Sequence, residues 1–478
     1  MISSYRTKIG LEIHCQLTGL RSKLFCSCHC NYREYYPNEN ICPICMGLPG
    51  TLPLLNQTAI EKAAMVCMAL GCTIPKKIMF YRKNYFYLDL PKNFQLTQYN
   101  AHGITSIGVD GLLKYGRGEA RIRRIQLEED PGRLVYLNGS SGSLIDYNRA
   151  GVSLVEIVTE PDFNDPQDVR LFLNKLASIV EHLGVCDTTL EGAVRCDANV
   201  SLGESRRVEI KNVSSFRDVE KALKFEITRQ KTMLNYEMEI KGETRHWDEQ
   251  RKITKQSRLK EEEQDYRYFY ESDIPMIEIV EEYLQGVRSK MPELPDERKE
   301  RFINSYRLTE HVSQVLIDHK DLADFFEESV KIYSAPKEIS NIIVTDLMSY
   351  VDDSSKKLGS DIGNLKITPK QLAKVARMIK EGVINRTTAR QILYEVVATG
   401  KMSAAQDEKG TNLRKIDDES VILRSIESIF ASETLAVDDA KKNPNVANYL
   451  LGKVMQLTKG RADPELALSL INKKLLEA

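Results

Sequence analysis

The cysteines of this 478-residue chain constrain its fold more than any other feature, because eight of the ten precede residue 73. Four of them form two short-spaced pairs, Cys26-Ser27-Cys28 and Cys42-Pro43-Ile44-Cys45, with 13 residues between the pairs. Each pair can span one edge of a tetrahedron, which is the geometry that zinc adopts with four thiolates. Four thiolates leave no open coordination position, so we expect a structural zinc ion and not a catalytic one.

Two alternatives stay open at these cysteines. Free cysteines are commonly buried as small apolar residues, although four at this spacing are hard to explain in that way. His29 and Cys30 stand beside the first pair, and either could replace one of the four ligands. Gly47 follows the second pair, which suits a tight turn that points backbone N–H groups at sulfur.

The overall composition is that of an ordinary globular protein. Hydrophobic residues make up 42% and charged residues 28%, which excludes a disordered or collagen-like chain. The formal net charge of -1 excludes nucleic-acid binding by bulk positive charge, although it leaves room for a local basic surface. No apolar run reaches the roughly 18 residues of a membrane span, and residues 1–8 lack an apolar signal core. We therefore expect a cytoplasmic protein.

The pattern of apolar residues changes along the chain and predicts three domains. Residues 1–293 alternate apolar and polar residues in many short stretches, which predicts a mainly antiparallel β domain with helices at 56–70 and 165–183. Residues 294–410 repeat apolar residues at spacings of three and four, which predicts an all-helical domain. Residues 411–478 continue this pattern as a small helical tail. The expected fold class is α+β and multidomain.

A strictly alternating segment near the N-terminus holds the first candidate site residues. Residues 9–16 place Glu12 and His14 on one polar face of a predicted strand. Side chains two residues apart point the same way, with roughly 6–7 Å between their Cα atoms, and can bind one cation. From these two residues alone, a solvated polar face is the simpler interpretation.

Two further acidic segments are candidates to complete a metal site. Glu128 and Glu129 end an unusually basic strand, just before a Pro-Gly that stops it. Glu156 stands in the apolar run 154–158, and a buried glutamate needs a partner or a metal. Together with the carboxylate and imidazole of the first strand, these acids would make an oxygen-rich Mg²⁺ site with one nitrogen ligand. The spacing does not show that they meet.

Several segments are long and distinctive enough to compare with known families. They are Gly10-Leu11-Glu12-Ile13-His14, Cys42-Pro43-Ile44-Cys45-Met46-Gly47-Leu48-Pro49-Gly50, Arg82-Lys83-Asn84-Tyr85-Phe86-Tyr87, Leu127-Glu128-Glu129-Asp130, Glu156-Ile157-Val158-Thr159-Glu160-Pro161-Asp162 and Arg195-Cys196-Asp197-Ala198-Asn199-Val200-Ser201. Together they closely resemble GatB, the B subunit of the Asp/Glu-tRNA amidotransferase known as the GatCAB complex. Residues 452–455 and 459–464 resemble the terminal module that this family shares with YqeY-like proteins. The resemblance runs from residue 8 to the C-terminus.

The resemblance implies a fold, an activity and partners. The fold would be a catalytic cradle domain with a zinc loop, a helical domain and a YqeY-like tail. The activity would be ATP- and Mg²⁺-dependent phosphorylation of the side-chain carboxylate of Glu-tRNA(Gln) or Asp-tRNA(Asn), followed by amidation. Ammonia would come through a channel from glutamine hydrolysed by the amidase partner GatA, and the small protein GatC would complete the heterotrimer. This chemistry is that of a carbon–nitrogen ligase: a carboxylate is a poor electrophile until ATP converts it to an acyl phosphate.

The resemblance also implies residue roles. The expected Mg²⁺ ligands are Glu12, His14, Glu129 and Glu156, with Glu128 as a direct ligand or a supporting group. Lys83 and Lys92 would lie at the ammonia channel mouth or contact phosphate. The zinc ligands would be Cys26, Cys28, Cys42 and Cys45; other family members lack them, so zinc is not expected to be essential to the chemistry. The tail would contact tRNA through Lys453, Lys459 and Arg461.

Two other function classes compete with this assignment. One is a zinc-stabilised RNA-binding or assembly protein whose acidic residues no longer bind metal. The other is a free-standing ATP-dependent ligase, which the lack of any glutaminase signature opposes. No G-x-x-x-x-G-K-[ST] loop occurs in the sequence, so ATP would be held by another architecture. Which of the two aminoacyl-tRNAs is the physiological substrate stays open.

Overall fold

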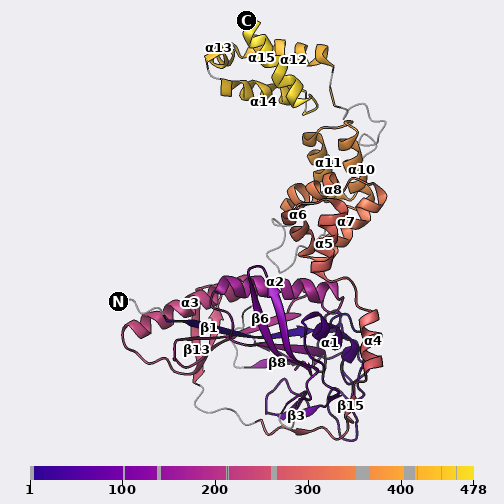
Figure 1. The fold of residues 1–478 in the computed structure, drawn as a ribbon, viewed down its shortest axis with the longest axis vertical. Coiled ribbons are helices and arrows are strands. Elements are labelled where there is room, and N and C mark those ends of the chain that lie inside the picture. Colours follow the sequence, from indigo (N-terminus) through magenta and orange to yellow (C-terminus); the bar gives the residue numbers. More distant parts are fainter. Residues whose placement is uncertain are drawn as a thin grey trace. The chain divides into compact units, whose positions relative to one another are not determined.

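The computed structural model describes residues 5–100, 103–136, 142–211, 213, 215–259, 266–350, 365–402, 415–416, 418–442, 444–458 and 460–477. Residues 1–298 form one compact unit, and most residues from 299 onward form a second. Figure 1 shows a large sheet with helices in the first unit and helices alone in the second. The predicted α+β class is confirmed.

Among the described residues, the main sheet of the first unit has eleven strands. They are β1 (Thr7–Gln16), β3 (Tyr81–Asn84), β4 (Phe94–Thr97), β5 (Gly108–Tyr115), β6 (Gly118–Glu129), β9 (Ser153–Thr159), β10 (Val194–Leu202), β11 (Val208–Lys211), β12 (Glu243–Asp248), β13 (Ile253–Leu259) and β14 (Phe269–Tyr270). Their order is β13-β12-β11-β10-β1-β9-β6-β4-β3-β14, and β5 pairs with β6. Within the described ranges, only β11 and β12 pair in parallel. Strands far apart in the sequence therefore meet at the centre of the sheet.

Two small sheets complete the strands of this unit. One pairs β2 (Lys77–Ile78) with β15 (Ile277–Glu278), and the other pairs β7 (Arg133–Tyr136) with β8 (Ser143–Asp146).

Helices cover the apolar face of the main sheet. The helices of the first unit are α1 (Gln57–Ala69), α2 (Pro166–His182), α3 (Phe216–Asn235), α4 (Glu281–Ser289) and the 3₁₀ turn η1 (Tyr32–Glu34). α1 and α2 confirm the helices predicted at 56–70 and 165–183. The Asn56 side chain caps α1 by accepting from two backbone N–H groups, and the Asp165 side chain caps α2 by accepting from one, just before Pro166.

The alternation of β1 decides which side of the sheet is buried. Ile9, Leu11 and Ile13 are 0–1% exposed and join one core with residues of α2 such as Phe172 and Leu173. Their polar neighbours must then point to the opposite face, because successive side chains of a strand alternate. That face is where the candidate residues lie.

The remaining helices belong mainly to the second unit. They are α5 (Pro295–Tyr306), α6 (Glu310–Ile317), α7 (Lys320–Ile332), α8 (Pro336–Ile342), the π-helical η2 (Ile343–Leu347), α10 (Pro369–Lys380), α11 (Arg386–Thr399), α12 (Glu419–Ser432), α13 (Thr434–Lys442), the 3₁₀ turn η6 (Pro444–Val446), α14 (Ala447–Leu457) and α15 (Pro464–Glu477). None of the helices within the described ranges combines the length and the apolar character that crossing a bilayer requires.

The second unit contains two separate hydrophobic cores. One runs from Phe302 to Val396, and the other from Ile422 to Ile471. Two cores favour the predicted separation of a helical domain from a tail, although both lie in one compact unit. The division at 293/294 and 410/411 stays a prediction.

Candidate active site and metal centre

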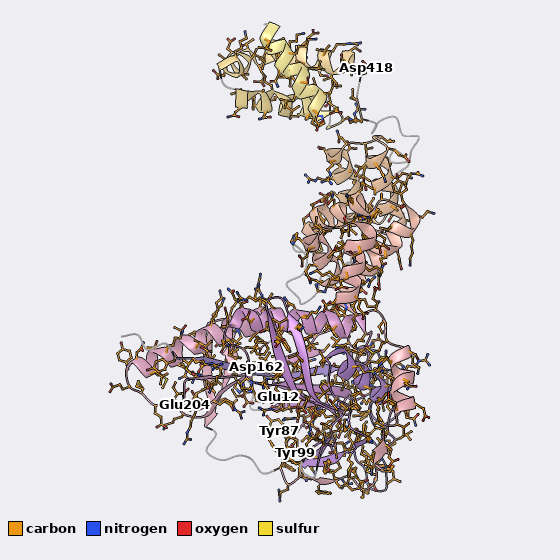
Figure 2. All side chains as sticks on the ribbon, in the orientation of Figure 1. Glu12, Tyr87, Tyr99, Asp162, Glu204 and Asp418 are labelled. Atoms are coloured by element: carbon orange, nitrogen blue, oxygen red, sulfur yellow. The ribbon has the colours of Figure 1, made fainter. Side chains whose placement is uncertain are left out.

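Glu12 and His14, on the polar face of β1, lie close to Glu156 of β9. His14 lies directly opposite Glu156 in the antiparallel pairing of β1 with β9, and Glu12 precedes His14 by two residues on the same face. One ligand atom from each of these three side chains lies within 4.8 Å of the others. Figure 2 labels Glu12 within the sheet of the first unit. The structure therefore joins residues that are more than 140 positions apart in sequence.

A fourth side chain, that of Glu128, reaches the same cluster from β6. Its carboxylate lies 3.9 Å from His14 Nε2, and the Glu12 carboxylate lies 3.6 Å from the same nitrogen. Thr97 Oγ1 donates a hydrogen bond of 3.0 Å to the other Glu128 oxygen. Three carboxylates and one imidazole thus face one another.

The electrostatics of the cluster favour a bound cation. Burial, together with the nearby Glu128 and Glu12 charges, raises the pKa of Glu156 well above its usual value. Burial also acts to raise the pKa of Glu12, but His14 and Lys211 outweigh it, so that this pKa is lowered. Crowded carboxylates repel one another, and a divalent cation relieves that repulsion. Oxygen ligands with one imidazole are a donor set that Mg²⁺ and Mn²⁺ accept, so the residues fit such an ion.

The cluster opens into a cavity of about 540 Å³ that also contains basic side chains. Lys83 of β3, Arg195 of β10 and Lys211 of β11 line it together with Glu12, His14 and Glu128. Lys83 Nζ lies 4.8 Å from the centroid of the Tyr266 ring. Burial acts to lower the pKa of Lys83, but Glu128 and other neighbours raise it, so the ammonium stays charged. The cavity therefore combines carboxylates with basic side chains, which suits a metal-bound polyphosphate.

Glu129, the neighbour of Glu128, does not join the cluster. Its carboxylate contacts Lys92 Nζ at 2.6 Å and accepts a hydrogen bond of 2.9 Å from the Leu96 backbone N–H. Lys92 and Glu129 line a second cavity, of about 340 Å³, together with Cys45 and Gly47. The structure thus brings Glu128, and not Glu129, to the other expected Mg²⁺ ligands.

The two cavities lie on opposite faces of the sheet. Neighbouring residues of a strand point to opposite faces of the sheet. On three strands, one residue lines the smaller cavity and its neighbour lines the larger one. The pairs, with the residue of the smaller cavity first, are Arg82 and Lys83 on β3, Phe94 and Gln95 on β4, and Glu129 and Glu128 on β6. Lys83 consequently lines the larger cavity and Lys92 the smaller one. Their closeness in sequence did not indicate this separation.

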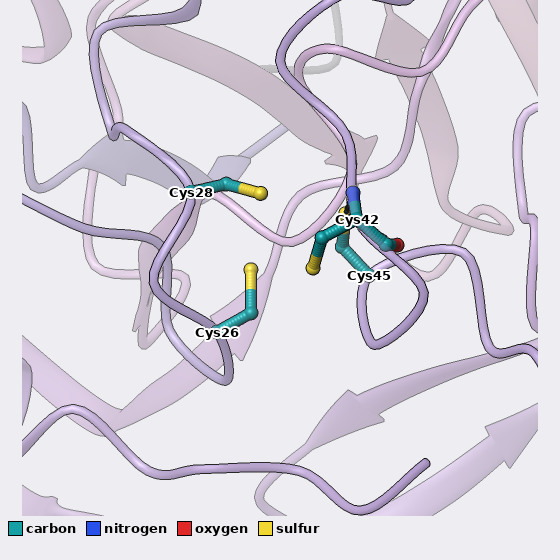
Figure 3. A group of neighbouring side chains, drawn as sticks. All are labelled: Cys26, Cys28, Cys42 and Cys45. Atoms are coloured by element: carbon teal, nitrogen blue, oxygen red, sulfur yellow. Dashed lines mark hydrogen bonds between the residues drawn. The ribbon is translucent and has the colours of Figure 1, made fainter. Parts of the chain in front are cut away.

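The four paired cysteines converge on one point, as Figure 3 shows. The Sγ atoms of Cys26, Cys28, Cys42 and Cys45 all lie within 4.8 Å of one another, which is the arrangement of a four-thiolate metal site. The group contains neither His29 nor Cys30 among the described residues. The Cys30 Sγ is buried and instead lies 3.5 Å from the Leu17 carbonyl oxygen.

Gly47 and Lys23 are neighbours of the cysteine cluster that favour thiolates able to bind a cation. The Cys42 backbone N–H donates to Cys45 Sγ at 3.1 Å, and Gly47 turns the chain at a φ of +64°. Lys23 is fully buried, and its Nζ lies 3.8 Å from Cys45 Sγ and 2.9 Å from the Asn40 carbonyl oxygen. A hydrogen bond from Cys26, with the charge of Lys23, lowers the pKa of Cys45 to about 5.

Comparison with known proteins agrees with this arrangement. A family model described as the GatB/GatE catalytic domain matches residues 7–285, and one described as the GatB domain matches residues 324–475. A protein of Sulfurisphaera tokodaii, named as the B subunit of an aspartyl/glutamyl-tRNA(Asn/Gln) amidotransferase, is 45% identical over 98% of this chain and 99% of its own. Proteins of the same name from Saccharolobus solfataricus and Thermotoga maritima are 42% and 44% identical over the same shares.

The chain belongs to the GatB/GatE family. The two matched segments contain the sequence motifs that resemble GatB. All the cavity residues described above lie inside the matched catalytic domain. The predicted family is confirmed.

The tRNA-contacting candidates lie in the part of the chain that matches the GatB domain. Lys453 of α14 pairs with Glu433 at 2.9 Å and lies 5.3 Å from the Tyr449 ring centroid. Arg461 Nε donates to the Thr458 carbonyl oxygen at 3.3 Å. Lys459 lies outside the described residues. Binding of tRNA by the GatB tail stays a prediction.

Several GatB residues near the sites were not identified as site residues from the sequence. They are Lys23, Asp130, Arg195, Asp197 and Lys211. The alternation of residues 194–202 was a usable signal, because it puts Arg195 and Asp197 on one polar face, as in the first strand. Lys23, between Ser22 and an apolar pair, gave no signal that distinguishes it from a surface lysine.

Proposed function

We propose that this chain is the activating subunit of a tRNA-dependent amidotransferase, a carbon–nitrogen ligase with glutamine as the amide donor. One observation carries the proposal: Glu156 clusters with Glu12 and His14, and these two residues and Glu128 line one cavity with three basic side chains, Lys83, Arg195 and Lys211. Phosphorylation of a carboxylate requires both a metal and cations around the transferring phosphoryl group. A protein that merely binds RNA has no use for a buried, mutually repelling set of carboxylates.

Glu12, His14 and Glu156 would hold Mg²⁺ directly, and Glu128 would be a further ligand or a hydrogen-bonding neighbour. When bound, the metal neutralises charge on the phosphates of ATP. The basic side chains orient the nucleotide, and the substrate carboxylate enters with the acceptor end of Glu-tRNA(Gln) or Asp-tRNA(Asn). Tyr85 lines the cavity, and its ring centroid lies 5.8 Å from that of Tyr266, which packs beside Lys83.

Lys92 and Glu129 would serve the second reactant. Their cavity lies on the other face of the sheet, where ammonia from a partner amidase would arrive. The Lys92–Glu129 pair and the hydrogen bond from Gln95 Nε2 to the Glu129 carbonyl oxygen close the gap between β4 and β6. We propose the Lys92 cavity as the channel mouth and the Lys83 cavity as the phosphate site.

The remaining assignments are structural. Zinc would bind Cys26, Cys28, Cys42 and Cys45 and fix the loop against Lys92, since a Cβ on Gly47 would come within 2.4 Å of Lys92 Cγ. The amidase GatA and the small protein GatC would complete a cytoplasmic heterotrimer. The helical domain and the tail, with Lys453, Lys459 and Arg461, would hold the body of the tRNA.

Glutamyl-tRNA-dependent ADP formation by the heterotrimer tests the proposal. Glu156→Gln should abolish it, because the variant loses a ligand without a change of size. Glu160→Gln is the matched control, since Glu160 is an acid nearby that pairs with Arg123 at the surface. Glutamine hydrolysis by the partner should survive in both variants. Equal ADP formation in wild type and Glu156→Gln would show that Glu156 is not a required ligand, and no ADP formation by the wild type would instead support an RNA-binding protein without catalysis.

A further inference from the structure

Asp130 is the most completely paired carboxylate beside the larger cavity. It is 1% exposed and follows β6 directly. Its Oδ1 accepts a hydrogen bond of 2.7 Å from Arg195 Nη2, and its Oδ2 accepts one of 2.6 Å from Gln16 Nε2. Arg149 Nε lies 3.9 Å away.

Arg195 is held by this aspartate at the edge of the site. It lies opposite His14 in the pairing of β1 with β10, so both side chains are on the same face of the sheet. Its side chain is 36% exposed and lines the larger cavity. The ion pair with Asp130 engages Nη2, while the buried Nε has no hydrogen-bond partner among the described residues. A guanidinium has five N–H donors, so donors remain for a ligand.

The other two basic residues of the cavity are lysines, which lack the planar fork of donors that a guanidinium has. Lys211 Nζ lies 2.9 Å from Asp197 and 3.4 Å from Glu209. Lys83 is packed against the rings of Tyr85 and Tyr266. Arg195 therefore combines a fixed position with free donors, which is what recognition of a planar or tetrahedral oxyanion requires.

We propose that Arg195 binds the phosphoryl oxygens during transfer and that Asp130 is its positioning residue. The proposal rests on the proposed function. In the first step a side-chain carboxylate oxygen of the aminoacyl group bonds to the γ-phosphorus of ATP, and ADP leaves with the electron pair of the broken P–O bond. In the second step the ammonia nitrogen bonds to the acyl carbon, phosphate leaves with the C–O electron pair, and one proton passes from nitrogen to water. Both steps concentrate negative charge on phosphoryl oxygens.

A purely structural role is the competing explanation. The Asp130–Arg195 pair connects the end of β6 to β10 across two intervening strands, and this alone would stabilise the sheet. The two explanations differ for Arg195→Lys. A lysine keeps the charge opposite Asp130, but it loses the guanidinium's fork of donors, so only the phosphoryl-binding role predicts a selective loss.

The experiment uses the heterotrimer that contains this chain as wild type, Arg195→Lys or Arg195→Ala. Arg121→Ala is the control, because Arg121 pairs with Asp162 at 2.7 Å on the same sheet and is exposed. Three quantities are measured: glutamyl-tRNA-dependent ADP formation, the melting temperature, and the affinities for Mg·ADP with and without aluminium fluoride. The ADP–fluoride complex mimics the transferring phosphoryl group, so its binding reports the contact without turnover.

For Arg195→Lys we expect ADP formation to fall by about 100-fold or more, as for removal of one donor to a developing oxyanion. Affinity for Mg·ADP should change by less than about 3-fold, while the preference for the fluoride complex disappears. Asp130→Asn should lose part of the same preference. The inference is overturned if Arg195→Lys keeps both ADP formation and the preference, or if activity falls only together with the melting temperature. If the wild-type complex forms no ADP at all, the proposed function fails instead. Should Arg195→Ala fail to assemble, the lysine variant alone carries the test.

Discussion

Glu128 and Glu129 are covalent neighbours whose carboxylates enter different cavities. Glu128 faces His14 at 3.9 Å, whereas Glu129 faces Lys92 at 2.6 Å on the other side of the sheet. An acidic dipeptide at a strand end therefore supplies two separate sites, because successive side chains alternate. Because the two carboxylates lie in different cavities, we expect substitution of each glutamate to change a different step of the reaction.

Glu128→Gln and Glu129→Gln should separate phosphorylation from ammonia use. We expect Glu128→Gln to lower glutamyl-tRNA-dependent ADP formation by about 10-fold or more, the loss seen on changing a group that supports a metal site. Glu129→Gln should form ADP at a rate closer to wild type, but with less amide product per ADP when glutamine is the donor. Measuring ADP and Gln-tRNA in the same reaction checks this. Identical ratios of the two products in both variants would contradict the two-cavity assignment.

Glu156→Gln should stabilise the metal-free protein while it abolishes activity. The raised pKa of Glu156 means that the folded state holds a proton that the unfolded state releases above about pH 4.3. Stability from this group is therefore present at lower pH and is lost as the pH rises toward the folded-state pKa. Glutamine does not ionise, so the variant does not lose stability in this way. Its melting temperature should therefore exceed that of the wild type by an amount that grows as the pH rises from about 5 to about 8.

Magnesium provides the control for this prediction. Mg²⁺ should raise the melting temperature of the wild type, because it binds the folded state and relieves the repulsion among the carboxylates. It should have little effect on Glu156→Gln. Equal stabilisation of both proteins by Mg²⁺ would mean that the ion binds elsewhere.

Removal of zinc should destabilise the first unit and leave the second largely folded. Thiolate coordination contributes folding free energy, so Cys42→Ala or a strong chelator should lower the first melting transition. Elemental analysis of protein purified with trace zinc should give about one zinc per chain. Cys186→Ala, a buried cysteine outside the cluster, should retain the metal. A metal content near zero in the wild type would remove the basis for this assignment.

Deletion of residues 411–478 should weaken tRNA binding without changing glutamine hydrolysis in the absence of tRNA. The tail has its own hydrophobic core, so its loss should not expose the core between Phe302 and Val396. We expect a higher KM for aminoacyl-tRNA with a similar kcat, since binding common to ground and transition states is lost. The affinity of the wild type should fall with salt more steeply than that of the truncated complex. Parallel salt dependences would show that the tail has a different role.

The sequence carried much of the fold because its signals are local. The alternation in β1 and the caps at Asn56 and Asp165 involve residues a few positions apart. The spacing of the cysteine pairs likewise predicted a cluster that the folded loop forms. Such patterns are decided within one element or one loop.

The assignment of Glu129 could not be made in this way. Its position at a strand end, before a Pro-Gly, gave no means of fixing the face to which it points. Which residue of β6 faces which side of the sheet depends on the pairing of β6 with β4 and β9. The register of β6 against β9 also shifts between Ile122 and Arg124. Asp130 and Arg195 likewise come together only through the order of the strands between β6 and β10. Long-range pairing therefore decided what local patterns left open.

The buried Lys23 gives the cysteine loop its own counter-charge for the thiolates. With metal bound, four thiolates and a divalent ion leave excess negative charge that the Lys23 ammonium partly balances. Without metal, the hydrogen bond from Cys26 and the charge of Lys23 lower the pKa of Cys45 to about 5, so one thiolate still balances the fully buried ammonium. Lys23 also donates to the Asn40 carbonyl oxygen, so it joins the cysteine cluster to the segment between the cysteine pairs. The charge and the backbone of the cysteine loop are therefore both held at Lys23, ahead of any metal.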